Sequence, residues 1–379
     1  MANYQVCTRC VMDTSDPEIM FDNNGICNHC IRACERLKQP PYGLPLIEKN
    51  NSLNELLQKI KNSGKYNKYD CVIGLSGGVD STYLAYLVKQ WELHPIAVHL
   101  DNHWNSEIAN QNIDNIITIL KLDTKRIVIN WEEFKDLQLA FLNASTPDLE
   151  IPSDNGIFSA LWDTAIEYNI KYILAGYNLS SESILAKSWA QGYFDKTYIN
   201  GIHKKFGKLN KLDFHILSTW DLIKNKRFNK INLIRTLDYV DYDKNIAKQI
   251  IKKELNWKDY GRKHGESTYT RIVQEYILPK KFNIDKRKAH LSSLIISGQI
   301  TRDEAIRELS IPLYNNEQDI QSDINILCNK FEITKTEFEK IMKLPIRSIN
   351  DYPNEKKTFQ FMIIQFVRFL LRIKRKIIS

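Results

Sequence analysis

Apolar and polar positions follow two alternating patterns along the first half of the chain. Short apolar runs predict strands at 70–75 (DCVIGL), 95–100 (PIAVHL), 126–130 (RIVIN) and 171–176 (KYILAG). Longer segments with apolar residues at helical spacing predict helices at 52–62, from 80 onward, and at 106–121, 132–143 and 155–168. Strands that alternate with helices are typical of a parallel sheet covered on both faces. The pattern therefore predicts an α/β domain of Rossmann-like type.

The pattern changes after about residue 185. The segment 185–265 is rich in Lys, Asn, Tyr and Trp and shows few clear strands. Beyond it the pattern is helical, at 267–277, 285–297, 301–309, 317–330 and 335–342, with a long tail from about 354. The proline- and glycine-rich stretch KQPPYGLP (38–45) marks a linker. We expect three parts: a cysteine-rich module and linker (1–45), the α/β domain (46–250) and a helical domain that binds substrate or a partner (251–379).

The net charge excludes few classes of ligand. The 379 residues carry a formal charge of +8, which suits phosphorylated or nucleotide-linked substrates, or RNA, without choosing between them. No apolar run reaches the ~20 residues that cross a bilayer, and the start lacks a secretory pattern, so we expect a cytoplasmic protein. The tail 359–379 is apolar and then basic. We favour a docked C-terminal helix with solvated basic residues over a helix at a membrane surface.

Cysteines cluster at the start of the chain. Two Cys-x-x-Cys pairs, separated by sixteen residues, have the spacing of a four-thiolate metal site, with the ligands Cys7, Cys10, Cys27 and Cys30. A structural zinc ion is the preferred interpretation; an iron–sulfur cluster and free or redox thiols are the alternatives. His29 and Cys34 lie close enough in sequence to compete as ligands.

A glycine-containing loop follows the first predicted strand. In SGGVDS (76–81), two glycines allow close approach to an anion, and the following helix N-terminus offers unpaired N–H groups. Asp80 stands where a carboxylate would hold Mg²⁺ or cap the helix. The loop lacks the lysine of a Walker A motif, which suits chemistry at the α-phosphorus of ATP rather than γ-phosphoryl transfer. The expected nucleotide contacts are Ser76, Gly77, Gly78, Val79, Asp80, Ser81 and Thr82.

This loop resembles the signature of the PP-loop ATP pyrophosphatase superfamily, whose fold is the adenine nucleotide alpha hydrolase-like fold. The alternative is a glycine turn that binds no ligand. In the superfamily, a segment after the second strand contacts adenosine, which implies a role for Asp101 in VHLDNHWNSE (98–107). AGYNLSSES (175–183) resembles a second short motif of the superfamily. That similarity implies nucleotide contacts at Gly176 and Asn178 and a role for Glu182 in catalysis or magnesium binding.

A more specific resemblance covers nearly the whole chain. YQVCTRCVMDTSDPEIMFDNNGICNHC, SGGVDST and residues 257–305 are similar to the N-acetyl sugar amidotransferase family of bacterial surface-polysaccharide, O-antigen and nonulosonic acid pathways. The resemblance implies conversion of a sugar N-acetyl group into an acetamidino group, with ATP cleaved to AMP and pyrophosphate. It also implies partners, a glutaminase and a cyclase-like subunit, that supply ammonia. Position 2 is Ala and no cysteine is flanked by glycines, so the chain shows no glutaminase nucleophile of its own.

Basic residues at the start of the third part are candidates for substrate binding. Lys263, Lys280, Lys281 and Arg287 would bind an anionic sugar, and His264 or Glu266 would handle protons. The alternative for each is an ordinary solvated helix face. The second functional hypothesis is a tRNA-modifying PP-loop enzyme that thiolates or amidates a base. For thiolation, only Cys71 and Cys328 lie outside the N-terminal module as candidate sulfur carriers, and they do not form a pair. A non-catalytic scaffold is the third hypothesis.

Overall fold

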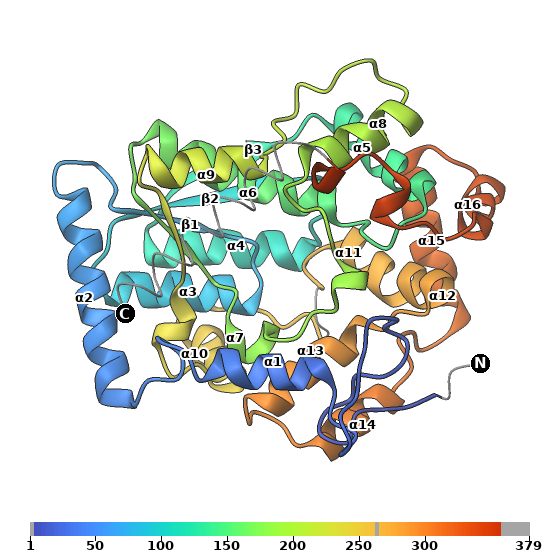
Figure 1. Ribbon diagram of the computed structural model, residues 1–379. Coiled ribbons are helices and arrows are strands. Elements are labelled where there is room, and N and C mark those ends of the chain that lie inside the picture. Colours follow the sequence, from blue (N-terminus) through green and yellow to red (C-terminus); the bar gives the residue numbers. More distant parts are fainter. Residues whose placement is uncertain (1–3, 262–264, 358–379) are drawn as a thin grey trace.

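The computed structural model describes residues 4–261 and 265–357, and Figure 1 shows how their elements are arranged. Three of the sequence predictions, at Lys263, His264 and the tail 359–379, lie outside these residues. Within them the chain has the predicted α/β architecture, with a parallel sheet, a cysteine cluster near the start and a helical region toward the end.

The central sheet has five strands in the order β3-β2-β1-β4-β5, and every neighbouring pair is parallel. Four strands match the predicted apolar runs, and the fifth lies in the segment where few strands were expected. The strands are β1 (Cys71–Gly74), β2 (Pro95–Asp101), β3 (Asp123–Val128), β4 (Tyr172–Ala175) and β5 (Asn232–Arg235). The residues of β5 are all half-buried, and the strand is only four residues long, so its apolar signal is weak.

Helices cover both faces of the sheet, as buried parallel strands require (Figure 1). One face carries a core formed with α2 (Leu46–Gly64), α3 (Val79–Gln90), α4 (Glu107–Leu120) and α10 (Lys244–Leu255). The other face packs against α6 (Ile151–Glu167) and α9 (Thr219–Arg227). The connections α5 (Trp131–Ala144) and α8 (Lys196–Phe206) pack against each other beyond this core.

The strand order reverses direction at β1. The chain runs from β1 to β2 and β3 on one side, and returns to place β4 and β5 on the other. In open parallel sheets, ligands bind at the carboxyl ends of the strands at such a switch point. The loop after β1 and the segment after β4 meet at this point. The topology therefore brings together the two motifs that resemble those of the PP-loop superfamily.

The first part of the chain is held by two isolated bridges, Val6 with Asp13 and Phe21 with Cys27, and by α1 (Asn28–Leu37). This helix packs against α7 (Leu179–Glu182) and α13 (Lys286–Ile296). The short helix α7 directly follows β4, so the N-terminal module contacts the edge of the sheet where the motifs meet.

The helical region begins with a continuous helical stretch in which one turn is a π-helix. The successive elements are α11 (Thr268–Ile272), the π-turn η3 (Val273–Ile277), α12 (Leu278–Phe282), α13, α14 (Arg302–Ser310), α15 (Glu317–Phe331) and α16 (Lys335–Lys343). Short 3-10 turns occur at η1 (Lys187–Trp189), η2 (Thr236–Tyr239), η4 (Ile349–Asp351) and η5 (Glu355–Lys357).

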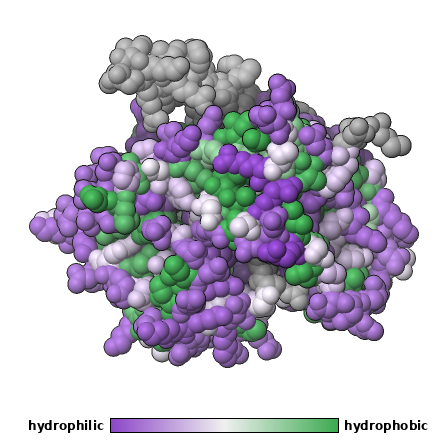
Figure 2. Space-filling model, turned by 90° about the horizontal axis from the view of Figure 1, so that it is seen from below, coloured by the Kyte–Doolittle hydropathy of each residue, from purple (hydrophilic) through white to green (hydrophobic). Residues whose placement is uncertain are grey.

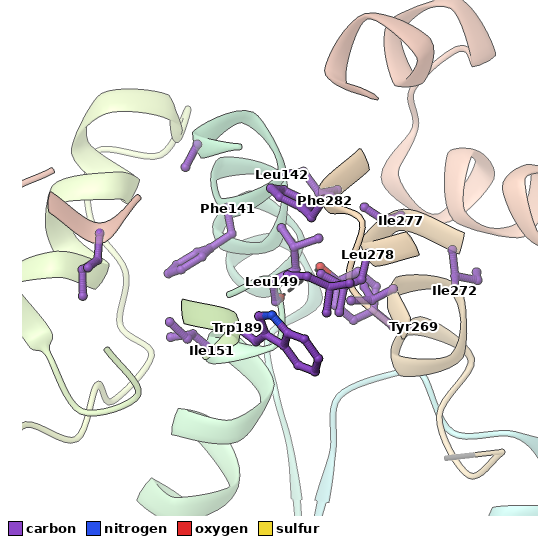
Figure 3. Close-up of a cluster of buried hydrophobic side chains, with 14 of the residues drawn as sticks. Phe141, Leu142, Leu149, Ile151, Trp189, Tyr269, Ile272, Ile277, Leu278 and Phe282 are labelled. Carbon is purple, nitrogen blue, oxygen red and sulfur yellow. Dashed lines mark hydrogen bonds between the residues drawn. The ribbon is translucent and has the colours of Figure 1, made fainter. Parts of the chain in front are cut away.

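Buried side chains join this region to the α/β core. In Figure 3, Phe141 and Leu149 lie near Trp189, Tyr269 and Phe282, which come from segments far apart in sequence. The same cluster contains the four N-terminal cysteines. Figure 2 shows one face of the molecule, where hydrophilic residues predominate and apolar residues form separate patches. No helix among the described residues is long and apolar enough to span a bilayer.

Candidate functional site

The loop after β1 has the geometry of an anion site. Gly77 has a φ of +79°, which a residue with a side chain adopts at a cost, and Gly78 is the N-cap of α3 without any side-chain cap. The first N–H groups of α3 have no partner within the helix and carry its partial positive charge. The hydroxyl of Ser76 accepts a hydrogen bond from the Gly78 N–H at 3.3 Å and lies 3.0 Å from that of Ser81. The loop thus presents hydroxyls and N–H groups to one anion.

Two aromatic side chains donate hydrogen bonds to the backbone of this loop. The indole N–H of Trp257 donates to the Gly77 carbonyl at 2.7 Å, and the hydroxyl of Tyr260 donates to the same oxygen at 2.5 Å. Burial raises the pKa of Tyr260, so its hydroxyl stays protonated and donates. Because the peptide is planar and trans, a fixed Gly77 carbonyl directs the Gly78 N–H to the opposite side. These residues set the orientation of a peptide that faces the anion site.

The side chain of Asp80 is held by a residue 162 positions away. The Tyr242 hydroxyl donates a hydrogen bond to its Oδ1. Burial and the charge of Asp80 raise the pKa of Tyr242, which keeps the proton on the phenol. The carboxylate oxygen Oδ2 has no recorded partner within the part of the chain that the structure describes, and carboxylate oxygens suit Mg²⁺. No local pattern predicted these contacts of Tyr242, Trp257 and Tyr260, because they join segments that are far apart in the chain.

The motif after β4 packs directly onto the loop. A Cβ at Gly176 would lie 3.0 Å from the carbonyl oxygen of Asp80 and 3.1 Å from the Ser81 nitrogen, so only glycine fits. Asn178 is buried and caps α7, accepting from the Ser181 N–H at 3.0 Å. Glu182 is exposed at the end of α7. The structure thus brings Gly176 to the loop after β1, whereas Asn178 shapes the turn that follows Gly176.

Glu266 comes to the loop from the start of the helical region. Its backbone carbonyl accepts from the Ser106 N–H at 2.9 Å, and the Thr268 N–H donates to the Trp104 carbonyl at 2.8 Å. A Cβ at Gly78 would lie 3.7 Å from Oε1 of Glu266. This carboxylate therefore faces the same loop as Asp80, and together they offer oxygen ligands of the type that Mg²⁺ prefers.

The segment after β2 is tightly bonded. Asp101 pairs with Arg126 at 2.6 Å and accepts from the His103 N–H at 3.0 Å. His99 bonds through Nδ1 to the Leu75 carbonyl at 2.8 Å, directly before the loop. Burial lowers the pKa of His99, which favours the neutral ring. The predicted adenosine contact Asp101 therefore has two structural partners at the carboxyl end of β2.

Acidic groups gather beside the site around Lys286. Its ammonium lies 2.8 Å from Glu150, which also accepts from Gln274 at 2.9 Å. Burial, and then the charge of Glu150, raise the pKa of Asp154 to about 7, and the charge of Glu182 acts in the same direction. Burial raises the pKa of Asp148 to about 7 as well. The charge of Glu182 therefore acts on this acidic group.

The basic residues predicted to bind substrate differ in their surroundings. Lys281 donates to three carbonyls, those of Ile341, Met342 and Leu344, at 2.7, 3.1 and 2.9 Å. Arg287 binds the carboxylate of Asp285 and the carbonyls of Glu308 and Ile311. Lys280 is exposed. Lys281 and Arg287 therefore stabilise the helical region, and their charges are largely used within it.

The four cysteine sulfurs lie within 4.8 Å of one another and are fully buried. The Sγ atoms of Cys7 and Cys30 are 3.8 Å apart, and those of Cys10 and Cys27 are 3.7 Å apart. A tetrahedral zinc ion with bonds of ~2.3 Å needs sulfurs separated by ~3.8 Å. The arrangement therefore fits zinc, and backbone N–H groups at 3.2–3.4 Å from the sulfurs favour the thiolate form.

His29 and Cys34 take no part in this cluster. His29 is bound by Asp16 at 2.6 Å and by Arg32 at 3.0 Å, so both ring nitrogens have partners. Cys34 is half-buried and lies outside the group of four. The candidate metal centre thus consists of the four predicted ligands.

Comparison with protein families shows which family the helical region resembles. Residues 266–368 match the family described as LPS biosynthesis protein WbpG-like, C-terminal domain. This region is WbpG-like. The match confirms the predicted resemblance to proteins of surface-polysaccharide synthesis. The WbpG-like region begins at Glu266, the residue whose carboxylate lies near Gly78 in the loop after β1.

Curated relatives match part of the chain. An uncharacterized protein of Methanocaldococcus jannaschii, MJ1599, is 27% identical over 177 residues, which cover 46% of this chain and 59% of that protein. The tRNA-specific 2-thiouridylase MnmA 2 of Fusobacterium nucleatum is 32% identical over 119 residues, 29% of this chain and 34% of the relative. The chain thus spans less than two thirds of the length of the curated relatives it matches.

Solved structures give low TM-scores against this chain. An NH3-dependent NAD synthetase from Campylobacter jejuni gives a TM-score of 0.34 with 17% identity, covering 80% of this chain and 99% of that one. An NMN synthetase from Francisella tularensis gives 0.28 with 18% identity, covering 54% and 95%. These likenesses are too weak to assign an activity.

Proposed function

We propose that the protein is an ATP-dependent amidotransferase that converts an N-acetyl group of a sugar into an acetamidino group during surface-polysaccharide synthesis. The observation that carries the proposal is the contact between the two halves of the molecule. The WbpG-like region begins at Glu266, whose carboxylate lies against the loop after β1, and the N–H groups and hydroxyls of that loop suit a polyphosphate. A sugar bound by that region would lie next to the α-phosphate of a nucleotide held by the loop.

The chemistry has two steps. The oxygen of the acetamido group attacks the α-phosphorus of ATP, and the bond to pyrophosphate breaks, which leaves an O-adenylyl imidate. Ammonia then adds to the imidate carbon, a proton is lost, and the bond from carbon to the AMP oxygen breaks. The products are the acetamidino sugar, AMP and pyrophosphate. Water must be excluded, since hydrolysis of the imidate regenerates the amide.

Different residues at the loop have different roles in this reaction. The N–H groups at the start of α3 and the hydroxyls of Ser76 and Ser81 bind the departing pyrophosphate. Asp80 and Glu266 would hold Mg²⁺, which would neutralise charge on the phosphates when bound. Ammonia comes from a separate glutaminase with a cyclase-like subunit, in keeping with the family that the sequence resembles. The sugar is acidic or nucleotide-linked.

The test is product analysis. The purified protein is incubated with ATP, Mg²⁺, an ammonium salt and a panel of UDP-linked diacetamido sugars and nonulosonic acids. We expect one sugar to become lighter by about one mass unit, with equal amounts of AMP and pyrophosphate. The Asp80→Asn variant, which keeps the size of the side chain, serves as the inactive control. AMP release without any change in a sugar would exclude the proposed reaction.

A tRNA-modifying enzyme is the second candidate, favoured by the stretch of 32% identity with a 2-thiouridylase. The cysteines speak against thiolation. Cys71 and Cys328 are buried, and burial raises the pKa of both thiols, which makes them poor nucleophiles. If bulk tRNA stimulates AMP release while no sugar changes mass, this second candidate replaces the first.

A further inference from the structure

The short helix α7, which follows the Gly176 motif, is tied at both ends by other parts of the chain. Oδ1 of Asp238 accepts from the Leu179 N–H at 2.8 Å. At the other end, a guanidinium nitrogen of Arg36 donates to the Ser183 carbonyl at 3.1 Å. Arg36 belongs to α1 of the cysteine module, and Asp238 belongs to η2, directly after β5. The two ties bring the N-terminal module and the end of β5 to the same short segment.

A second arginine stands at this place. Arg235 is the last residue of β5, and its Nε lies 2.8 Å from Oδ2 of the buried Asp238. That oxygen nevertheless accepts no hydrogen bond among the described residues, so the close contact lacks hydrogen-bond geometry. A guanidinium carries five N–H donors. Within the described part of the chain, no acceptor is recorded for those of Arg235, and only one is recorded for Arg36.

Arg36, Arg235 and Asp238 together carry two positive charges and one negative charge. Burial, and then the positive charge of Arg235, lower the pKa of Arg36, while Asp238 raises it. Asp238 thus acts on both guanidinium groups, and it is 1% exposed. Taken with Asp238 alone, the two arginines leave one net positive charge and guanidinium donors without a recorded acceptor, which suits a phosphate or carboxylate; Glu182 also acts on the neighbouring Tyr177.

The location suits a substrate. Arg235 lies at the carboxyl end of β5, and β4 separates it from β1 and its loop. Neighbouring strands are ~4.8 Å apart, so the two carboxyl ends are separated by about 10 Å. This distance is of the order of that between an acetamido group and an anionic group across one sugar ring. Tyr177, directly after Gly176, experiences the charge of Arg235.

We infer that Arg36 and Arg235 bind an anionic group of the sugar substrate, either a phosphate or a carboxylate. The inference rests on the proposed function, and it moves the expected anion contacts away from Lys281 and Arg287. The cysteine module then has a direct part in substrate binding, through a residue of α1.

Direct binding tests the site without turnover. Calorimetry with a non-hydrolysable ATP analogue present would measure three probes: UDP-N-acetylglucosamine, N-acetylneuraminic acid and neutral N-acetylglucosamine. We expect Arg36→Gln and Arg235→Gln each to weaken the anionic sugar at least about tenfold, because each removes a charge-assisted hydrogen bond. The ATP analogue should bind as before. Arg227→Gln, at an exposed arginine in the last turn of α9, is the control.

The outcomes separate the site from the reaction. Which anionic sugar loses affinity decides between a phosphate and a carboxylate. Unchanged affinity for both in Arg36→Gln, whose side chain is exposed and makes only one recorded bond, would overturn the site. A loss confined to the ATP analogue would also overturn it. If both arginines are needed for binding but no sugar is ever amidinated, the anion site stands and the amidotransferase proposal fails.

Discussion

The indole nitrogen of Trp257 donates a hydrogen bond of 2.7 Å to the carbonyl of Gly77, 180 residues earlier in the chain. Tyr260 donates to the same oxygen. Asn112 in turn binds the backbone of Lys258 at 2.7 and 2.9 Å, which fixes this segment to α4. The orientation of the loop peptide is therefore set by residues that directly precede the WbpG-like region.

Removing one of the two donors should impair nucleotide binding. Tyr260→Phe deletes the hydroxyl and leaves the ring, so we expect the KM for ATP to rise about two- to tenfold, the value of one hydrogen bond, with a smaller change in kcat. Steady-state kinetics checks this. Tyr66→Phe, at a highly exposed tyrosine, is the matched control. Equal KM values for Tyr260→Phe and wild type would show that Trp257 alone suffices.

Asp80 and Tyr242 should be separable by their magnesium dependence. Asp80→Ala should abolish pyrophosphate release, because it removes the carboxylate, while the fold persists. Tyr242→Phe keeps the carboxylate but frees it to rotate, so we expect activity that needs more Mg²⁺ for half-saturation. Titration of pyrophosphate release with Mg²⁺ distinguishes the two. Full activity of Asp80→Ala would remove this residue from the magnesium site.

Gly176→Ala should displace the loop. The added Cβ would meet the backbone of Asp80 and Ser81 at 3.0–3.1 Å, and backbone cannot move aside as a flexible side chain does. We expect a loss of ATP affinity of tenfold or more with a modest fall in melting temperature. Gly74→Ala is the control, since its Cβ would meet only Leu161, at 3.5 Å. The same affinity in both variants would contradict the close contact.

Loss of the metal should weaken the module and its surroundings. Cys10→Ser is expected to lose one equivalent of zinc and to lower the free energy of unfolding by several kcal/mol, since structural zinc stabilises a fold directly. Metal analysis and thermal unfolding measure both effects. Cys34→Ser should change neither. A wild-type metal content in Cys10→Ser would reject the four-thiolate site.

Stability should fall as the pH rises from about 4 to about 7. Between these values the folded protein holds protons on Asp148 and Asp154, whose pKa values are raised to about 7, and the unfolded chain does not. Each unit of pKa difference corresponds to about 1.4 kcal/mol. Asp148→Asn should flatten the pH profile of the unfolding free energy in part, with Asp154 providing the remainder. A profile identical to wild type would contradict the raised pKa of Asp148.

Local sequence was sufficient for much of the fold. Apolar runs predicted four of the five strands, and the spacing of Cys7, Cys10, Cys27 and Cys30 predicted a cluster that the structure brings together. Both signals are local, because a strand or a Cys-x-x-Cys pair is encoded within a few residues. The fifth strand is short and half-buried, so its sequence lacks a clear apolar pattern.

The supports of the site could not be predicted in this way. Tyr242 and Trp257 act on the loop through contacts across more than 160 residues, which no local pattern reports. The positive charge of a side chain likewise did not reveal which groups it contacts in the folded protein. Lys281 and Arg287 looked like substrate ligands, yet the structure satisfies them with carbonyls and a neighbouring carboxylate. Arg36 and Arg235 belong to distant segments and became a pair only in the folded chain.

The pairing of residues 104–106 with 266–268 bears on how such proteins can be recombined. In a chimera that exchanged only the WbpG-like region, Glu266 would come from one parent and its partner segment at Trp104 from the other. Trp257 and Tyr260, which support the loop, would come from the same parent as Trp104. Chimeras between relatives should therefore place the junction before residue 256, so that the loop's supports and the WbpG-like region are inherited together.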